Sequence, residues 1–175
     1  RVASSLLDIV REPVGDLSFR TPIAQWGDAL VRLGYTEPIE DLKAAAALQT
    51  DTVIKDALES CVRRLQLLLK NGDDVAAWDT AAASSFPDVR LLAYRRLAQI
   101  GSPASVRAIA RRLAKTDLPT DERAEALIAI GEARTAGAAD LVERHLADPA
   151  YDAWDLQRAR SAAAYAARRL GGERM

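Results

Sequence analysis

The sequence predicts an all-α protein built from helices packed in pairs. Apolar residues recur at three- and four-residue spacings along almost the whole 175-residue chain, which is the spacing of one helix face. Alternating runs of β-branched residues, which would indicate strands, are absent. Most Gly and Pro residues lie between the periodic segments, where they end one helix and begin the next. A chain of this length can bury a sizeable core.

Composition narrows the classes of function. Hydrophobic residues make up 49% and charged residues 28%, which is typical of a soluble globular protein. The net charge of -1 provides no overall field that would favour nucleic acid or an anionic membrane. No apolar run approaches the roughly 18 residues of a membrane span, and no signal peptide is visible, so we expect a cytoplasmic protein. Because the chain begins at Arg1, we expect it to be part of a longer polypeptide.

The clearest helix pair lies in VRLLAYRRLAQIGSPASVRAIARRLA, residues 89–114. Pro87 suits the first position of a helix, because its missing N–H has no partner there. Gly101 suits the left-handed turn that ends the helix. Ser102 can cap the following helix, with Pro103 at its first position. This stretch therefore predicts two helices joined by a tight corner.

The same pair recurs along the chain. An offset of 33 residues places Arg90 on Arg123, and an offset of 70 places Arg90 on Arg160. An offset of 67 in the other direction places Gly34 on Gly101. A period near 33 residues is the signature of stacked helical repeats.

The repeat predicts an α-solenoid, an α/α superhelix, of about four and a half helix pairs, in which each repeat contacts only its neighbours. The predicted elements are a short helix near 2–12 and a loop, helix pairs at 22–34 and 37–48, 51–70 and 73–84, 87–100 and 103–115, and 120–133 and 137–147, and a last helix at 153–170. Residues 1–21 are expected to form a cap or linker, and residues 22–175 the repeat domain.

The repeat resembles HEAT-like repeats, especially the short form named after phycobilisome lyases. The residues that carry the resemblance are Val89, Arg90, Ala93, Leu97, Gly101, Ser102, Pro103, Val106 and Ile109. The second copy departs at its corner, which reads Arg134-Thr135-Ala136. The resemblance covers residues 87–171 closely and 22–84 more loosely. It implies an armadillo-type fold, often found in bacterial proteins.

No catalytic constellation is visible, so we expect a protein that is not an enzyme and holds no cofactor or metal. His145 is the only histidine and Cys61 the only cysteine, which is too few for a zinc site and excludes an intrachain disulfide. Cys61 is expected to be a buried thiol. Trp78 is expected in the core, and Trp154 could seal the open end of the stack. The resemblance implies that Arg90, Arg123 and Arg160 bind Asp or carbonyl groups of adjacent repeats.

In HEAT-type stacks the second helix of each pair lines the concave side. The outward-facing positions of those helices are Glu40, Asp41 and Lys43, then Asp74, Asp79 and Thr80, then Arg107, Arg111 and Arg112, and last Asp140, Glu143 and Arg144. The predicted groove is therefore acidic at its N-terminal end and basic around the third pair. Residues 1–86 hold 9 basic and 13 acidic residues, giving -4, and residues 87–175 hold 15 and 12, giving +3.

This pattern predicts a scaffold that binds a protein partner or another domain of its own chain. We expect Arg107, Arg111 and Arg144 to make contacts, with Asp74 and Asp79 at the acidic end. A solvated surface without a partner is the plain alternative.

Two further alternatives stay open. The resemblance allows a bilin-lyase-like protein. The Arg-rich C-terminal half allows nucleic-acid binding, although a duplex usually needs a denser basic stripe. The oligomeric state is not predicted.

Overall fold

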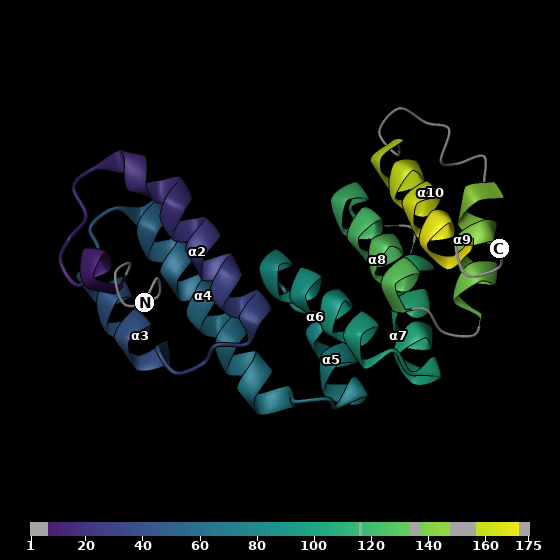
Figure 1. The fold of residues 1–175 in the computed structure, drawn as a ribbon, viewed down its shortest axis with the longest axis horizontal. Helices are drawn as coiled ribbons and strands as arrows, with labels where there is room; N and C mark the ends of the chain where they lie inside the picture. Colours follow the sequence, from purple (N-terminus) through teal and green to yellow (C-terminus); the bar gives the residue numbers. More distant parts are fainter. Residues whose placement is uncertain (1–6, 116, 134–136, 148–156, 172–175) are drawn as a thin grey trace. The chain divides into compact units, whose positions relative to one another are not determined.

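The computed structural model describes residues 7–115, 117–133, 137–147 and 157–171. These residues form helices and the turns between them and contain no strand, which confirms the predicted all-α class (Figure 1). The chain divides into two compact units, Arg1–Gly72 and Asp73–Met175. The boundary falls between the two helices of the second predicted pair.

The first unit is organised around one long helix. A short 3₁₀ helix, η1 (Leu17–Phe19), leads into α2 (Arg20–Leu33), which is followed by α3 (Ile39–Leu48) and α4 (Thr52–Asn71). Helix α4 packs against both α2 and α3 (Figure 1). Helices α2 and α4 start side by side, because Arg20 Nη2 lies 2.6 Å from Asp51 Oδ2. The largest fully buried side chains here are Ile23, Leu42, Ile54, Leu58 and Leu65.

A buried glutamine fixes the segment that precedes α2. The Gln49 side chain, at the end of α3, is 6% exposed. Its amide nitrogen donates to the carbonyls of Val10 at 3.0 Å and Glu12 at 3.1 Å, and its oxygen accepts from the Val14 N–H at 2.9 Å. Residues 10–14 are therefore held to the first unit by three bonds to one side chain.

The second unit contains two layers of helices. Its elements are α5 (Val75–Ala81), α6 (Pro87–Ile100), α7 (Pro103–Leu113), α8 (Thr120–Ala133), α9 (Ala138–Ala147) and α10 (Gln157–Gly171). Helix α8 packs between α6 and α10. Helix α7 packs against α5, α6 and α8, and α9 packs against α8 and α10 (Figure 1). Each helix therefore contacts near neighbours in the sequence.

The predicted corner after α6 is confirmed. Gly101 adopts the left-handed conformation, with φ 63°, and its N–H donates to the carbonyl of Leu97. The Ser102 side chain caps α7 by accepting from the N–H of Ser105 at 3.1 Å. Pro87 and Pro103 occupy the first turns of α6 and α7. Local sequence signals therefore fix both ends of this corner.

Small residues allow α8 and α10 to approach closely. A Cβ atom added to Gly131 would lie 2.5 Å from the Cα atom of Ala166, which is too close for any side chain. Ala162, Ala163 and Ala166 of α10 are buried. The alanine run of α10 thus forms a close contact with α8.

Most predicted helix bounds agree with the structure to within three residues, but α5 is shorter than predicted. It begins at Val75 because Asp74 caps it, and it ends at Ala81 instead of residue 84. Residues 7–10 are helical, within the predicted first helix. Trp154 and the corner at residues 134–136 lie outside the described residues. None of the described helices combines the length and apolar character needed to cross a membrane.

Candidate functional site

A residue predicted for the acidic N-terminal end of the groove pairs with a residue predicted for its basic part around the third helix pair. Arg111 Nη2 of α7 lies 2.8 Å from Asp79 Oδ2 of α5. Arg112 Nη2 donates to the backbone carbonyl of Asp79 at 2.7 Å and lies 3.7 Å from Asp79 Oδ1. Asp79 is therefore engaged by two arginines, and its charge is not available as a separate acidic end.

Asp74 has a structural use as the N-cap of α5. Its Oδ1 atom accepts from the N–H groups of Ala76 at 2.8 Å and Ala77 at 3.2 Å. A carboxylate at this position also complements the helix dipole. The side chain is exposed, so capping does not hide it from a partner.

The other predicted contact residues are exposed on two different helices. Arg107 lies one turn before Arg111 on α7 and forms no hydrogen bond or ion pair with any described residue. Arg144 lies on α9, where its Nε donates to the carbonyl of Asp140 in the same helix at 3.2 Å. The structure thus brings Arg111 and Asp79 together and places Arg107 beside them along the helix.

The predicted difference in net charge between the two halves of the sequence nearly disappears when the chain is divided into its two units. Residues 1–72 hold 9 basic and 10 acidic residues, giving -1, and residues 73–175 hold 15 of each, giving 0. Asp73, Asp74 and Asp79 belong to the same unit as the arginines of α7. The acidic and basic ends of the predicted groove therefore do not coincide with the two units.

The repeated arginines at the start of α6 and α8 have the structural role that the resemblance implies. Arg90 Nε lies 2.7 Å from Glu122 Oε2, and its Nη1 donates to the carbonyl of Ser84 at 2.9 Å. Arg123 donates to the carbonyls of Leu113 at 3.1 Å and Lys115 at 2.9 Å. Both arginines thus bind groups near the end of an adjacent helix. The third repeated arginine, at position 160, is exposed on α10.

A buried polar network joins α6 to α8. The Tyr94 hydroxyl donates to Glu122 Oε1 at 2.8 Å, and Arg90 binds the other carboxylate oxygen. Tyr94 is fully buried and Glu122 is 5% exposed. Burial, together with the hydrogen bond to Glu122, raises the pKa of Tyr94 well above its ordinary value. The sequence did not predict this pairing, because Tyr94 and Glu122 lie on different helices, 28 residues apart.

Cys61, Trp78 and His145 differ in how far they are buried. Cys61 is 1% exposed, and burial raises the pKa of its thiol to about 11, so the nucleophilic thiolate is scarce at neutral pH. Trp78 is fully buried, as predicted. His145 is half-buried on α9. Within the described ranges, no three His, Cys, Asp or Glu side chains gather where they could hold a metal ion.

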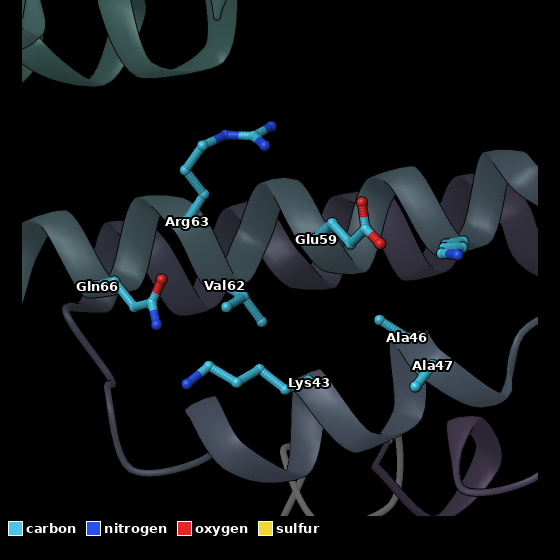
Figure 2. Close-up of a pocket in the computed structure, with 8 residues that line it drawn as sticks. Lys43, Ala46, Ala47, Glu59, Val62, Arg63 and Gln66 are labelled. Carbon is cyan, nitrogen blue, oxygen red and sulfur yellow. The ribbon is translucent and has the colours of Figure 1, made fainter.

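A groove that the sequence did not predict lies in the first unit, between α3 and α4 (Figure 2). Its volume is about 330 Å³. Its lining residues are Lys43, Ala46, Ala47, Lys55, Glu59, Val62, Arg63 and Gln66. Lys43 was predicted to face outward, but the spacing of residues on one helix does not reveal how far α4 lies from it.

In comparisons with known proteins, no family model, curated protein or solved structure matches this chain. Its function is therefore argued from its own residues and from the near-neighbour packing of its helices.

Proposed function

We propose that this chain is a HEAT-like α-solenoid module that binds an acidic segment, either of a partner protein or of another domain of the same polypeptide. The exposed face of α7 is the contact surface, with Arg144 of α9 as an accessory cation. The repeat period and the two layers of helices in the second unit support a solenoid. A preformed helical surface needs little reorganisation on binding, which lowers the cost of association.

The observation that carries this proposal is the placement of Arg107 and Arg111. The two guanidinium groups lie four residues apart on α7, so they project from neighbouring turns of the same face. Arg107 has no carboxylate partner among the described residues, and the Arg111 side chain is 62% exposed. Arg binds carboxylates with two parallel hydrogen bonds, which favours an acidic segment as ligand.

Asp79 has a positioning role in this proposal. It restrains Arg111 on the surface of α7, while Arg112, whose side chain is 16% exposed, anchors the backbone of α5. When a partner carboxylate engages Arg111, Asp79 keeps its contact with Arg112. Arg111 can therefore exchange one carboxylate for another while the Arg112 guanidinium stays 3.7 Å from Asp79 Oδ1.

Capture from a lysate of the source organism tests the proposal. The baits are the wild-type chain, Arg107→Glu/Arg111→Glu, and the control Arg168→Glu/Arg169→Glu, which makes the same change in charge on α10. We expect a protein with an acidic segment to be lost from the first variant and kept by the control. Equal capture by all three baits would contradict the proposed surface.

The same capture separates the two alternatives. Nucleic acid that is lost from the α10 variant would favour nucleic-acid binding through the Arg-rich C-terminal half. A bilin-bearing protein among the captured partners, together with pigment transfer on co-expression, would favour the lyase-like alternative. Either result would replace the binding of an acidic segment as the function.

A further inference from the structure

We propose that the groove between α3 and α4 is a binding site for a small amphipathic carboxylate, a ligand with one carboxylate and a short apolar body. This inference concerns the first unit and does not depend on the proposed function of α7. The groove volume of about 330 Å³ lies within the range of small-molecule sites.

The charge of the groove favours an anion. Its lining holds two lysines, Lys43 and Lys55, against the single carboxylate of Glu59, whereas the Arg63 side chain points away from the space between the helices in Figure 2. The first unit as a whole carries a net charge of -1, so this local excess of positive charge runs against its surroundings.

The two lysines can both accept a new partner. Lys55 is exposed and forms no ion pair with any residue that the structure describes. Lys43 Nζ lies 2.6 Å from Glu40 Oε1, but both side chains are exposed, at 42% and 82%. Such surface pairs contribute little to stability, so a ligand carboxylate can take the place of Glu40.

The floor of the groove is apolar. Ala46 and Val62 are buried, and Ala47 lies one residue further along α3. In Figure 2 the Lys43 side chain runs along the space between the helices, while Val62 and Gln66 point into that space from α4. The aliphatic stem of Lys43 therefore adds apolar surface beside its charge. A ligand that fits both features needs an apolar body beside its anionic group.

The lining favours a carboxylate over a phosphate. All eight lining residues lie within α3 or α4, where most backbone N–H groups are used by the helices themselves. Phosphate sites commonly use free backbone N–H groups at a helix N-terminus or a glycine-rich loop. Here recognition rests on separate ammonium groups and the side-chain amide of Gln66, which suits a single carboxylate.

The chain has only four lysines, which makes a direct test possible. Lys43 and Lys55 line the groove, whereas Lys70 and Lys115 do not. Reductive methylation with ¹³C retains the lysine charge and gives one NMR signal for each site, assigned with single Lys→Gln variants. Octanoate is the probe, 1-octanol is its uncharged counterpart, and inorganic phosphate tests a bare anion.

We expect octanoate to shift the Lys43 and Lys55 signals saturably, with a dissociation constant on the order of 1 mM, and to leave Lys70 and Lys115 unchanged. Lys43→Gln/Lys55→Gln should weaken octanoate binding at least tenfold, measured by calorimetry on the unmethylated chain. The matched control, Lys70→Gln/Lys115→Gln, should change it less than twofold. Gln66→Glu should weaken it without removing a lysine.

Four results would overturn the proposal. Equal shifts of all four lysine signals would indicate non-specific association. Equal shifts with 1-octanol would show that the carboxylate is not recognised, and saturable shifts with phosphate alone would assign a different ligand class. The absence of any saturable shift up to about 10 mM octanoate would also exclude the site, because that limit is well above the expected dissociation constant.

Discussion

Arg111 on α7 and Asp79 on α5 are 32 residues apart in the sequence and form an ion pair of 2.8 Å. The pair joins Asp79, from the predicted acidic end of the groove, to Arg111, from its predicted basic part. Arg112, the next residue of α7, binds the backbone carbonyl of the same aspartate. One aspartate therefore links two consecutive arginines of α7 to α5, whereas Arg107 has no ion-pair partner among the residues that the structure describes.

We expect Arg112 to contribute more to stability than Arg111. The Arg111 side chain is 62% exposed, so solvent screens its pair with Asp79, and Arg111→Ala should cost less than about 1 kcal/mol. The Arg112 side chain is 16% exposed and binds a carbonyl, so Arg112→Ala should cost about 1–3 kcal/mol. Urea unfolding measures the free energy of unfolding of both variants. The control Arg107→Ala should stay within about 0.5 kcal/mol of the wild type. A larger loss of stability for Arg111→Ala than for Arg112→Ala would contradict this account of the contacts with Asp79.

The contact between α8 and α10 should not tolerate a side chain at position 131. Gly131→Ala places a Cβ atom 2.5 Å from the Cα atom of Ala166, so a helix must shift. We expect a loss of about 1–3 kcal/mol by thermal or urea unfolding, despite the higher helix propensity of Ala. Gly171→Ala in α10 is the control, because no atom lies within 4 Å of its added Cβ. Equal stability of the two variants would mean that α8 and α10 pack less closely.

Substitutions in the buried network of α6 and α8 should destabilise the fold to different extents. Tyr94→Phe removes one hydrogen bond but leaves Glu122 bound to Arg90, so we expect a loss of about 1–2 kcal/mol. Glu122→Leu leaves the mostly buried Arg90 without its carboxylate and should cost about 3–5 kcal/mol. A double variant, Arg90→Met/Glu122→Leu, removes both charges and should recover part of the loss. If the double variant regained no stability in urea unfolding, the loss in Glu122→Leu would not come from an unpaired Arg90.

Cys61 should be unreactive in the folded chain and sensitive to alkaline pH. Burial raises the pKa of its thiol from 9.0 to about 11, so the folded state holds the proton more tightly than the unfolded state. The resulting stability is fully present below pH 9.0 and is lost as the pH rises through about 11. Unfolding free energies of the wild type and Cys61→Ala should therefore converge over this range. A constant difference between the two unfolding free energies over this pH range would contradict the raised pKa of Cys61.

Alkylation at pH 8 gives an independent check on the same thiol. We expect the folded chain to react at least about 100-fold more slowly than the chain in 6 M urea, because both burial and the high pKa suppress the thiolate. Val53→Cys in a Cys61→Ala background places a thiol at an exposed position of the same helix, where the wild-type side chain is 47% exposed. That control should react at a similar rate folded and unfolded.

Much of the local structure could be predicted because it depends on nearby residues. Gly101 and Ser102 fix the corner between α6 and α7 through their own backbone and side-chain preferences. The burial of Trp78 follows from its place in the repeat. The role of Arg90 is the one that the resemblance to HEAT-like repeats implies. These signals act within one helix or repeat over a few residues.

The unpredicted features depend on distances between helices. The pairing of Asp79 with Arg111 requires α5 and α7 to lie side by side, and outward-facing positions on each helix do not reveal that. The groove beside Lys43 depends in the same way on how closely α3 approaches α4. The boundary at Gly72 separates two helices that the repeat pattern places in one pair. The net charges of the two sequence halves therefore differ in sign, whereas the two units of the structure have nearly the same net charge.

A reciprocal charge exchange tests the binding of an acidic segment most directly. Fluorescence anisotropy would measure a labelled octaglutamate and a labelled octalysine against the wild type, Arg107→Glu/Arg111→Glu, and Arg168→Glu/Arg169→Glu. We expect the wild type and the α10 control to bind octaglutamate, and the α7 variant to lose at least tenfold in affinity and to gain affinity for octalysine. Equal loss in both variants, or no binding of octaglutamate by the wild type at low salt, would contradict the proposed role of α7.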